Sequence, residues 1–225
     1  MSHINRLFDK PYRHRFPLLV IKLAVVLHAF LPSKDVKALL YYLFRARVSH
    51  KTVCWWSKKF AEFTPPKKIK YKQDDTVILY ADEKFVKIKE IKAYWWSVRD
   101  HLGNVLSYLV TKNRDSASAK RLFRRAKQSI AGGVHAVVHD GLKSYDKPVR
   151  SIFGRKCKSI VAGIKGRFEF VNKKLFWITN NSAESLNAQI DCYISKHHYN
   201  FNNLESANQC AEMFMYRRNL REVCS

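Results

Sequence analysis

The chain has 225 residues, of which 47% are hydrophobic, so it is long and apolar enough to bury a core, and global disorder is excluded. It carries 42 Lys and Arg against 18 Asp and Glu, a formal net charge of +24. An excess of this size implies an anionic partner, nucleic acid first and a membrane surface second. The five cysteines show no C-x-x-C spacing, and no secretory signal is evident. We therefore expect free thiols in a reducing cytoplasm.

The first apolar stretch, residues 16–31, is shorter than a membrane span and is interrupted by Lys22 and His28. Its apolar residues recur at helical spacing, which predicts a core helix of a small bundle. The predicted buried face consists of Phe16, Leu19, Val20, Leu23, Val26, Leu27 and Phe30.

Two short helices around a tight turn are predicted next, beginning at the N-caps Ser33 and Ser49. Their apolar faces comprise Val36, Leu39, Leu40 and Leu43 in the first helix, and Val53, Trp56 and Phe60 in the second. The other face of the second helix presents His50, Lys51, Thr52, Trp55, Lys58 and Lys59. This pattern favours a helix-turn-helix whose second helix enters the major groove of DNA. An ordinary helical hairpin with a solvated basic face is the alternative.

The rhythm changes after Pro65 and Pro66, which stop a helix and precede a lysine-rich stretch. Three strand-like runs follow at 77–89, 91–100 and 104–113, with turns at Lys89–Glu90 and at 101–104. A helix capped by Ser116 or Ser118, a strand ending near Asp140, a second helix, a strand and two closing helices complete the chain. This order predicts a mixed α/β domain with one five-stranded sheet.

Three acids mark the elements of this domain. Asp82 lies near the end of the first strand, Asp140 ends the fourth, and Glu184 lies in the first turn of a late helix. Carboxylates that converge on one sheet edge repel each other, and hard divalent cations such as Mg²⁺ or Mn²⁺ relieve that repulsion. Taken singly, each acid has a simpler explanation in turn chemistry or the helix dipole. Strand alternation predicts that Glu83 points away from the face that carries Asp82.

Three short motifs carry a resemblance. "YADEKFVK", "VVHDGLKSY" and "NNSAESLN" resemble the catalytic motifs of insertion-sequence DDE transposases, which share an RNase H-like, retroviral-integrase-like core. The resemblance implies an RNase H-like mixed five-stranded sheet flanked by helices and preceded by a small all-α helix-turn-helix domain. It also implies that Asp82, Asp140 and Glu184 are catalytic and hold two Mg²⁺ ions, for which Mn²⁺ can substitute. The domains predicted on this basis are a DNA-binding domain at 1–66, a basic linker at 67–76 and a catalytic domain at 77–225.

The sequence departs from the family pattern at two places. The 43 residues between Asp140 and Glu184 exceed the family's compact spacing, and Glu169 lies inside the extra length without the N-N context. A basic residue that often follows the Glu is replaced on that helical face by Asn187 and Asp191. Lys143 is a predicted phosphate contact just after Asp140.

The implied function is DNA transposition: binding of element ends, metal-dependent strand cleavage and strand transfer. The implied partners are double-stranded DNA, both element ends and target, and further copies of the chain in a homodimer or larger complex. No membrane association is expected, and the predicted location is the cytoplasm, with the nucleoid. A non-catalytic, domesticated DNA-binding protein and a structure-specific nuclease on the same fold are the alternatives.

Overall fold

The computed structural model describes residues 15–61, 69–70, 75–163, 165–197 and 199–223. The chain forms two compact units: residues 1–65 with 191–200 and 208–225, and residues 66–190 with 201–207. These units are discontinuous in sequence, whereas the predicted domains are continuous. Most of the predicted linker at 67–76 lies outside the described residues. The functional division into domains therefore stays a prediction.

The first unit begins with three helices that pack on one another: α2 (Leu18–His28), α3 (Ser33–Phe44) and α4 (His50–Ala61). In α4 the Ser49 hydroxyl accepts a hydrogen bond from the Thr52 N–H at 3.0 Å, so this predicted N-cap is confirmed. Val53 and Trp56 are buried as expected. The three helices fit the predicted small all-α domain.

Details of α2 and α3 differ from the predictions. The stripe that α2 buries is Val20, Ile21, Ala24, Val25 and His28. Of the face predicted for this helix only Val20 is buried, and Leu19 is 67% exposed. Nearly every side chain of α2 is apolar, so hydrophobic spacing could not select a face. In α3, Pro32 occupies the N-cap position before Ser33, and Leu43 is 56% exposed.

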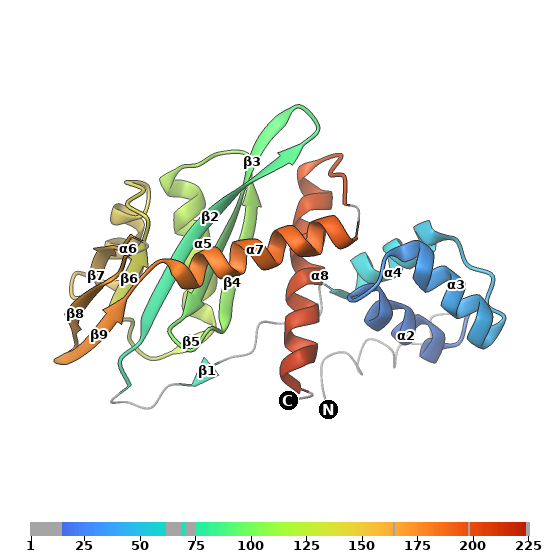
Figure 1. The fold of residues 1–225 in the computed structure, drawn as a ribbon, viewed down its shortest axis with the longest axis horizontal. Coiled ribbons are helices and arrows are strands. Elements are labelled where there is room, and N and C mark those ends of the chain that lie inside the picture. Colours follow the sequence, from blue (N-terminus) through green and yellow to red (C-terminus); the bar gives the residue numbers. More distant parts are fainter. Residues whose placement is uncertain (1–14, 62–68, 71–74, 164, 198, 224–225) are drawn as a thin grey trace. The chain divides into compact units, whose positions relative to one another are not determined.

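The second unit contains the predicted five-stranded mixed sheet (Figure 1). Its strands are β2 (Ile78–Ile88), β3 (Ile91–Asp100), β4 (Val105–Thr111), β6 (Ala136–His139) and β7 (Lys158–Val161), in the order β4-β3-β2-β6-β7. The first three strands pair antiparallel, while β6 runs parallel to both β2 and β7. This is the RNase H-like topology, so the predicted fold class is confirmed.

Both turns predicted in this meander are present. Ile88 pairs with Ile91 across a two-residue turn in which Lys89 has a φ of 49°. After β3, the Asp100 carboxylate accepts hydrogen bonds from the backbone N–H groups of Leu102 and Asn104 at 2.9 and 2.8 Å. These bonds replace ladder pairing and turn the chain into β4.

Helices cover one face of the sheet. α5 (Ser116–Gln128) and α6 (Asp146–Phe153) pack on each other, and α5 contacts β3 and β4. The core between them buries Leu79, Ala81, Trp96, Leu122, Phe123, Tyr145 and Val149. The N-cap of α5 is Asp115, whose carboxylate accepts from the Ser118 N–H at 2.8 Å, so the predicted cap at Ser116 or Ser118 is wrong. Asp competes well for this position because an ionised acceptor also favours the helix dipole.

The opposite face packs against the long segment between the second and third motifs. Ile78, Val138 and Ile160 of the sheet form a cluster with Val171 and Ile178. The latter two belong to an antiparallel hairpin, β8 (Arg167–Val171) and β9 (Lys174–Ile178), that was not predicted. It accounts for the extra length before Glu184. A short parallel pair, β1 (Ile69–Lys70) and β5 (Ile130–Ala131), was also not predicted.

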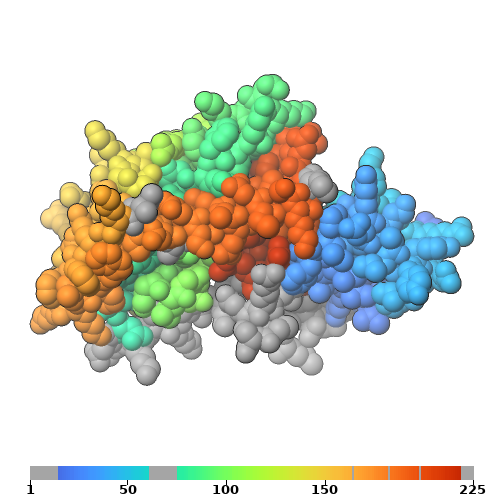
Figure 2. All heavy atoms as spheres, in the orientation of Figure 1, coloured from blue at the N-terminus to red at the C-terminus, as the bar shows by residue number. Residues whose placement is uncertain are grey.

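Two helices follow the hairpin: α7 (Asn181–Lys196) and α8 (Leu204–Val223). Residues 181–190 of α7 belong to the second unit and lie across the sheet in front of β2 (Figure 1). Figure 2 shows the same segment and the β8–β9 hairpin, in orange, exposed on one face. Among the described residues, the helices are too short or too polar to cross a membrane.

Candidate active site

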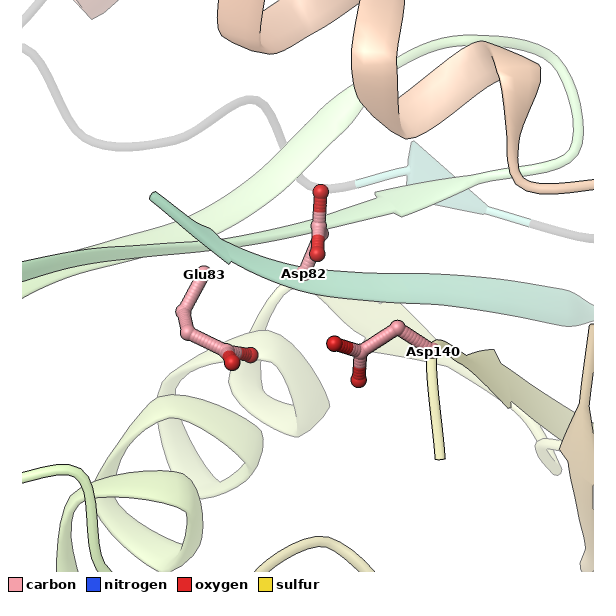
Figure 3. A group of neighbouring side chains, drawn as sticks. All are labelled: Asp82, Glu83 and Asp140. Carbon is pink, nitrogen blue, oxygen red and sulfur yellow. The ribbon is translucent and has the colours of Figure 1, made fainter. Parts of the chain in front are cut away.

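Three carboxylates gather at one edge of the sheet (Figure 3). Asp82 and Glu83 come from β2, and Asp140 directly follows β6. One oxygen of each lies within 4.8 Å of the others, and among the described residues this is the one acidic, His or Cys group close enough to hold a metal ion. Asp82 and Asp140, predicted from motifs 58 residues apart, are thus brought together.

The sheet register explains this convergence. β6 pairs with β2 only as far as Tyr80 opposite Val138, and β2 then continues past the end of β6. Asp82 therefore lies where Asp140 would be paired if the ladder continued. Among the described residues, no strand pairs with this edge of β2 between Tyr80 and the isolated bridge from Ile88 to Phe201, so side chains from both faces of β2 can reach toward Asp140.

Asp82 is buried, at 7% exposure, and its Oδ2 accepts a hydrogen bond from the Asn187 side-chain amide at 2.7 Å. Burial, followed by repulsion from Glu83 and Asp140, raises the pKa of Asp82 to about 6, although the Asn187 bond lowers it. Because Asn187 belongs to α7, this hydrogen bond fixes the N-terminal half of α7 on the Asp82 face of the sheet.

Glu83 also belongs to the cluster, which its predicted orientation away from the Asp82 face did not suggest. Alternation along β2 does hold, because Glu83 points to the α5 side, where its Oε2 accepts from the Tyr145 hydroxyl at 2.5 Å. From there its longer side chain reaches around the unpaired strand edge. Burial raises the pKa of Glu83, while the bonds from Tyr145 and Arg114 lower it.

Arg114 supplies positive charge beside these acids. Its Nε donates to Glu83 Oε1 at 2.7 Å, its Nη2 forms an ion pair with the same oxygen, and Nη2 lies 3.7 Å from Asp140 Oδ2. The Glu83 side chain is 2% exposed, whereas that of Arg114 is 43% exposed. Arg114 therefore compensates a buried carboxylate from the solvent side, which limits the cost of burying it.

Asp140 sits in a turn that its own carboxylate organises. Its Oδ1 accepts from the Leu142 N–H at 3.1 Å, and Gly141 adopts a φ of 98°, a conformation that favours glycine. The preceding His139 is buried, and burial lowers its pKa. Its Nδ1 accepts from the Gly141 N–H at 3.1 Å, so the neutral ring donates from Nε2 to Ser159 Oγ at 2.8 Å. His139 thus holds the Asp140 turn in place.

The remaining predicted residues lie elsewhere. Glu184 is exposed in the first turn of α7 and does not belong to the three-carboxylate group, so its role as third ligand stays a prediction. Lys143 is exposed in the turn after β6. On α4, His50, Lys51 and Trp55 are exposed, and Thr52, Lys58 and Lys59 are partly exposed. Glu169, the weaker rival for the third acid, pairs with Arg167 at 2.8 Å in the hairpin.

The donor set suits a hard divalent cation. Three carboxylates offer only oxygen ligands, and burial, with their mutual repulsion added to it, raises the pKa of Asp82. Sequence reasoning missed Glu83, Arg114 and Tyr145. The adjacent acids of "YADEKF" and the Tyr of "DGLKSY" were the available signals. Nothing in the sequence alone pointed to Arg114.

Acids on the first strand and directly after the fourth strand of an RNase H-like sheet are the arrangement expected of a DDE-type DNA transposase, and the family match bears this out. Residues 77–222 match the family model of the DDE domain of IS240-type transposases. This match spans more than half of the chain, which therefore belongs to that family. No curated protein matches the chain at a significant level.

Several solved structures resemble the chain weakly. The HTLV-2 integrase catalytic core domain in complex with magnesium, in its trimeric form, has 15% identity and a TM-score of 0.42 over 61% of this chain and 81% of the other. The dimeric form of that domain has 15% identity and a TM-score of 0.43 over 61% of this chain and 82% of the other. A chain of the simian T-cell lymphotropic virus intasome in complex with PP2A regulatory subunit B56 gamma has 12% identity and a TM-score of 0.45. The similarity covers 85% of this chain and 66% of the other. The assignment rests on the family match and the sheet topology.

Proposed function

We propose that the chain is the transposase of an insertion sequence, which binds the element ends, cleaves a DNA strand and transfers the freed 3′ end to target DNA. The observation that carries this proposal is the convergence of Asp82 and Asp140 at the sheet edge, with α7 held to Asp82 through Asn187. Catalysis by such a site rests on positioning and charge neutralisation, and no Ser or Tyr nucleophile is needed.

Asp82, Asp140 and Glu184 are the proposed metal ligands, for two Mg²⁺ ions or Mn²⁺ in their place. When bound, such ions supply Lewis-acid chemistry, activating the attacking oxygen and stabilising the leaving 3′ oxygen. The protein's own part is to hold the acids. Asn187 orients the Asp82 carboxylate, while Tyr145 and Arg114 orient that of Glu83.

The proposed reader of the element ends is the exposed face of α4. Trp55 is 53% exposed on this helix, and the Lys59 ammonium lies 5.0 Å from the centre of its indole ring. Exposing a large aromatic ring to water is unfavourable unless the ring contacts a partner. The exposed Trp55 ring beside the Lys59 ammonium therefore favours a contact with nucleic acid. Lys51, Lys58 and Lys143 are proposed phosphate contacts. A homodimer or larger assembly on DNA, and a location with the nucleoid in the cytoplasm, are part of the same proposal.

The proposal is tested with duplexes that carry the element's own ends, incubated with Mg²⁺ and an unrelated target duplex. Asp82→Asn, Asp140→Asn and Glu184→Gln should each abolish both cleaved and joined products. Glu90→Gln, an exposed turn acid outside the site, is the matched control and should react like the unaltered protein. Cleavage without any joined product would identify a structure-specific nuclease instead. Binding without either product, in Mg²⁺ and in Mn²⁺, would identify a non-catalytic DNA-binding protein.

A further inference from the structure

A groove lined by Lys and Arg side chains lies in the α/β unit, and none of the three clustered acids is part of its lining. α6, the turn that follows it, β7 and β8 enclose a groove of about 840 Å³. Lys and Arg account for 42 of the 225 residues of the chain but for six of the eleven that line this groove. The six cations are Lys147, Arg150, Arg155, Lys156, Lys158 and Arg167.

Most of this charge is uncompensated. Arg167 pairs with Glu169, which is the one carboxylate in the lining, and the Lys158 ammonium donates to the Phe170 carbonyl at 2.7 Å. The other four cations make no hydrogen bond or ion pair anywhere in the part of the chain that the structure describes, and all four are exposed. Like charges that line one groove repel one another, so an anion that enters the groove relieves this repulsion.

The lining indicates what kind of anion fits. Small-molecule sites are lined predominantly by apolar and aromatic side chains, with few polar groups. Here the apolar lining consists of Cys157 and Ile160, both buried, and the rest is polar or charged. An open row of flexible cations suits a chain of phosphates better than one compact ligand. Such side chains contact phosphates without reading bases.

The groove is connected to the acidic cluster. β7 lies beside β6, whose last residue, His139, precedes Asp140. Ser159 lines the groove, accepts the hydrogen bond from His139 Nε2 at 2.8 Å, and donates to Asp146 Oδ1 of α6 at 2.9 Å. The strand and helix that carry the cations are thereby fixed to the turn that carries Asp140.

We propose that this groove, from here on the β7 groove, binds the sugar–phosphate backbone of duplex DNA independently of its sequence. It holds the part of the duplex that flanks the phosphate undergoing reaction. This inference rests on the proposed function, because it takes the duplex to be the substrate of the acidic cluster. In this proposal the helix-turn-helix recognises the base sequence of the element ends, and the β7 groove binds the DNA backbone whatever its sequence.

The test compares two triple variants of the full chain that both lower the net charge by three. The groove variant is Lys147→Gln, Arg150→Gln and Lys156→Gln. The control variant is Lys87→Gln, Lys89→Gln and Lys92→Gln, three exposed lysines at the tip of the β2–β3 hairpin. Binding to an element-end duplex and to an unrelated duplex is measured in EDTA from 50 to 200 mM salt, and melting curves confirm folding.

Each phosphate contact contributes about 0.9 to the slope of log K against log salt, so the groove variant should lose about 2 to 3 in slope. The loss should be equal on both duplexes, and the control variant should keep the wild-type slope. Wild-type slope in the groove variant, equal losses in both variants, or a loss confined to the element end would overturn the inference. A loss of salt slope with duplex RNA but not with duplex DNA would also overturn it. Tight binding of inorganic pyrophosphate that the groove variant loses would overturn it as well, because it would indicate a small-anion site.

Because binding is measured without metal, the outcome is separate from the proposed function. Slope lost in the groove variant while the unaltered protein cuts no DNA would keep the β7 groove and refute the transposase proposal. Cleavage and joining by the unaltered protein, together with wild-type binding by the groove variant, would keep the transposase proposal and refute the β7 groove. In Mg²⁺, the groove variant should raise the DNA concentration needed for half-maximal cleavage and leave the rate at saturation unchanged.

Discussion

Replacing Asp82 by Asn should stabilise the folded protein at neutral pH in the absence of metal. The pKa of Asp82 is raised from 3.8 to about 6 by burial and by Glu83 and Asp140. At about 1.4 kcal/mol per pKa unit, the ionised carboxylate costs the folded state about 3 kcal/mol at neutral pH. Asn is isosteric and can still accept the hydrogen bond from Asn187, so most of this cost should be recovered.

The sign of the pH dependence follows from the direction of the shift. The folded protein holds the Asp82 proton more tightly than the unfolded chain does, so stability falls as pH rises from about 4 to 6. Above pH 6 the full cost is present, and below pH 4 it is absent. Asp82→Asn should therefore gain about 1 to 3 kcal/mol at pH 7.5 and nothing at pH 4.

Unfolding by urea in EDTA measures this difference, and hydrogen exchange of β2 and β3 amides reports the α/β unit on its own. Glu90→Gln at the exposed turn is the control and should change stability at neither pH. Added Mg²⁺ should stabilise the unaltered protein and have a much smaller effect on Asp82→Asn. A loss of stability in the variant at pH 7.5 without metal would refute the reasoning, because Asp82 would then support the fold rather than a ligand.

Three further outcomes are expected. Tyr145→Phe should lower the free energy of unfolding by about 1.5 to 3 kcal/mol, since it removes a hydrogen bond to the buried Glu83 carboxylate, as urea unfolding would show. Lys51→Ala with Lys58→Ala should weaken DNA binding and reduce its salt slope by about 2, and an unchanged slope in a binding titration would exclude α4 as the reader. Gly166→Ala should lower the melting temperature, because Gly166 has a φ of 65° and a Cβ there would lie 2.7 Å from the indole ring of Trp177 in β9.

The sequence predicted the five sheet strands and the meeting of Asp82 and Asp140, because both follow from apolar runs that end in an acid. In the structure β2 continues past Asp82 to Ile88, and the parallel register between β2 and β6 places Asp140 beside Asp82. The inclusion of Glu83 was not predictable by alternation alone. It depends on how far β2 extends past its last pair with β6, Tyr80 opposite Val138, and this extension is held by the hairpin partner β3.

The β8–β9 hairpin escaped prediction for a local reason. Its two-residue turn is Asn172–Lys173, and both residues adopt positive φ, 49° and 63°. Asn-Gly is the usual signal for such a turn, and Lys at the second position conceals it. The alternation in "RFEFV" and "KLFWI" is weak because both faces of the hairpin carry apolar residues. Val171 and Ile178 are buried on one face, whereas the other face is apolar but exposed and consists of Phe168, Phe170, Leu175 and Trp177.

The rotation of α7 about its axis links the motif-based assignment of Glu184 to the geometry of the acidic cluster. Glu184 and Asn187 are three residues apart and therefore lie on one face of the helix. The hydrogen bond from Asn187 to Asp82 turns that face toward the cluster. The N-N-x-x-E motif locates the acid within the helix, and the hydrogen bond of Asn187, one turn later, fixes the helix face on which the acid lies. Asn187→Leu, which removes the hydrogen bond and keeps the side-chain size, should therefore impair cleavage as Glu184→Gln does, although Asn187 is not itself a proposed ligand.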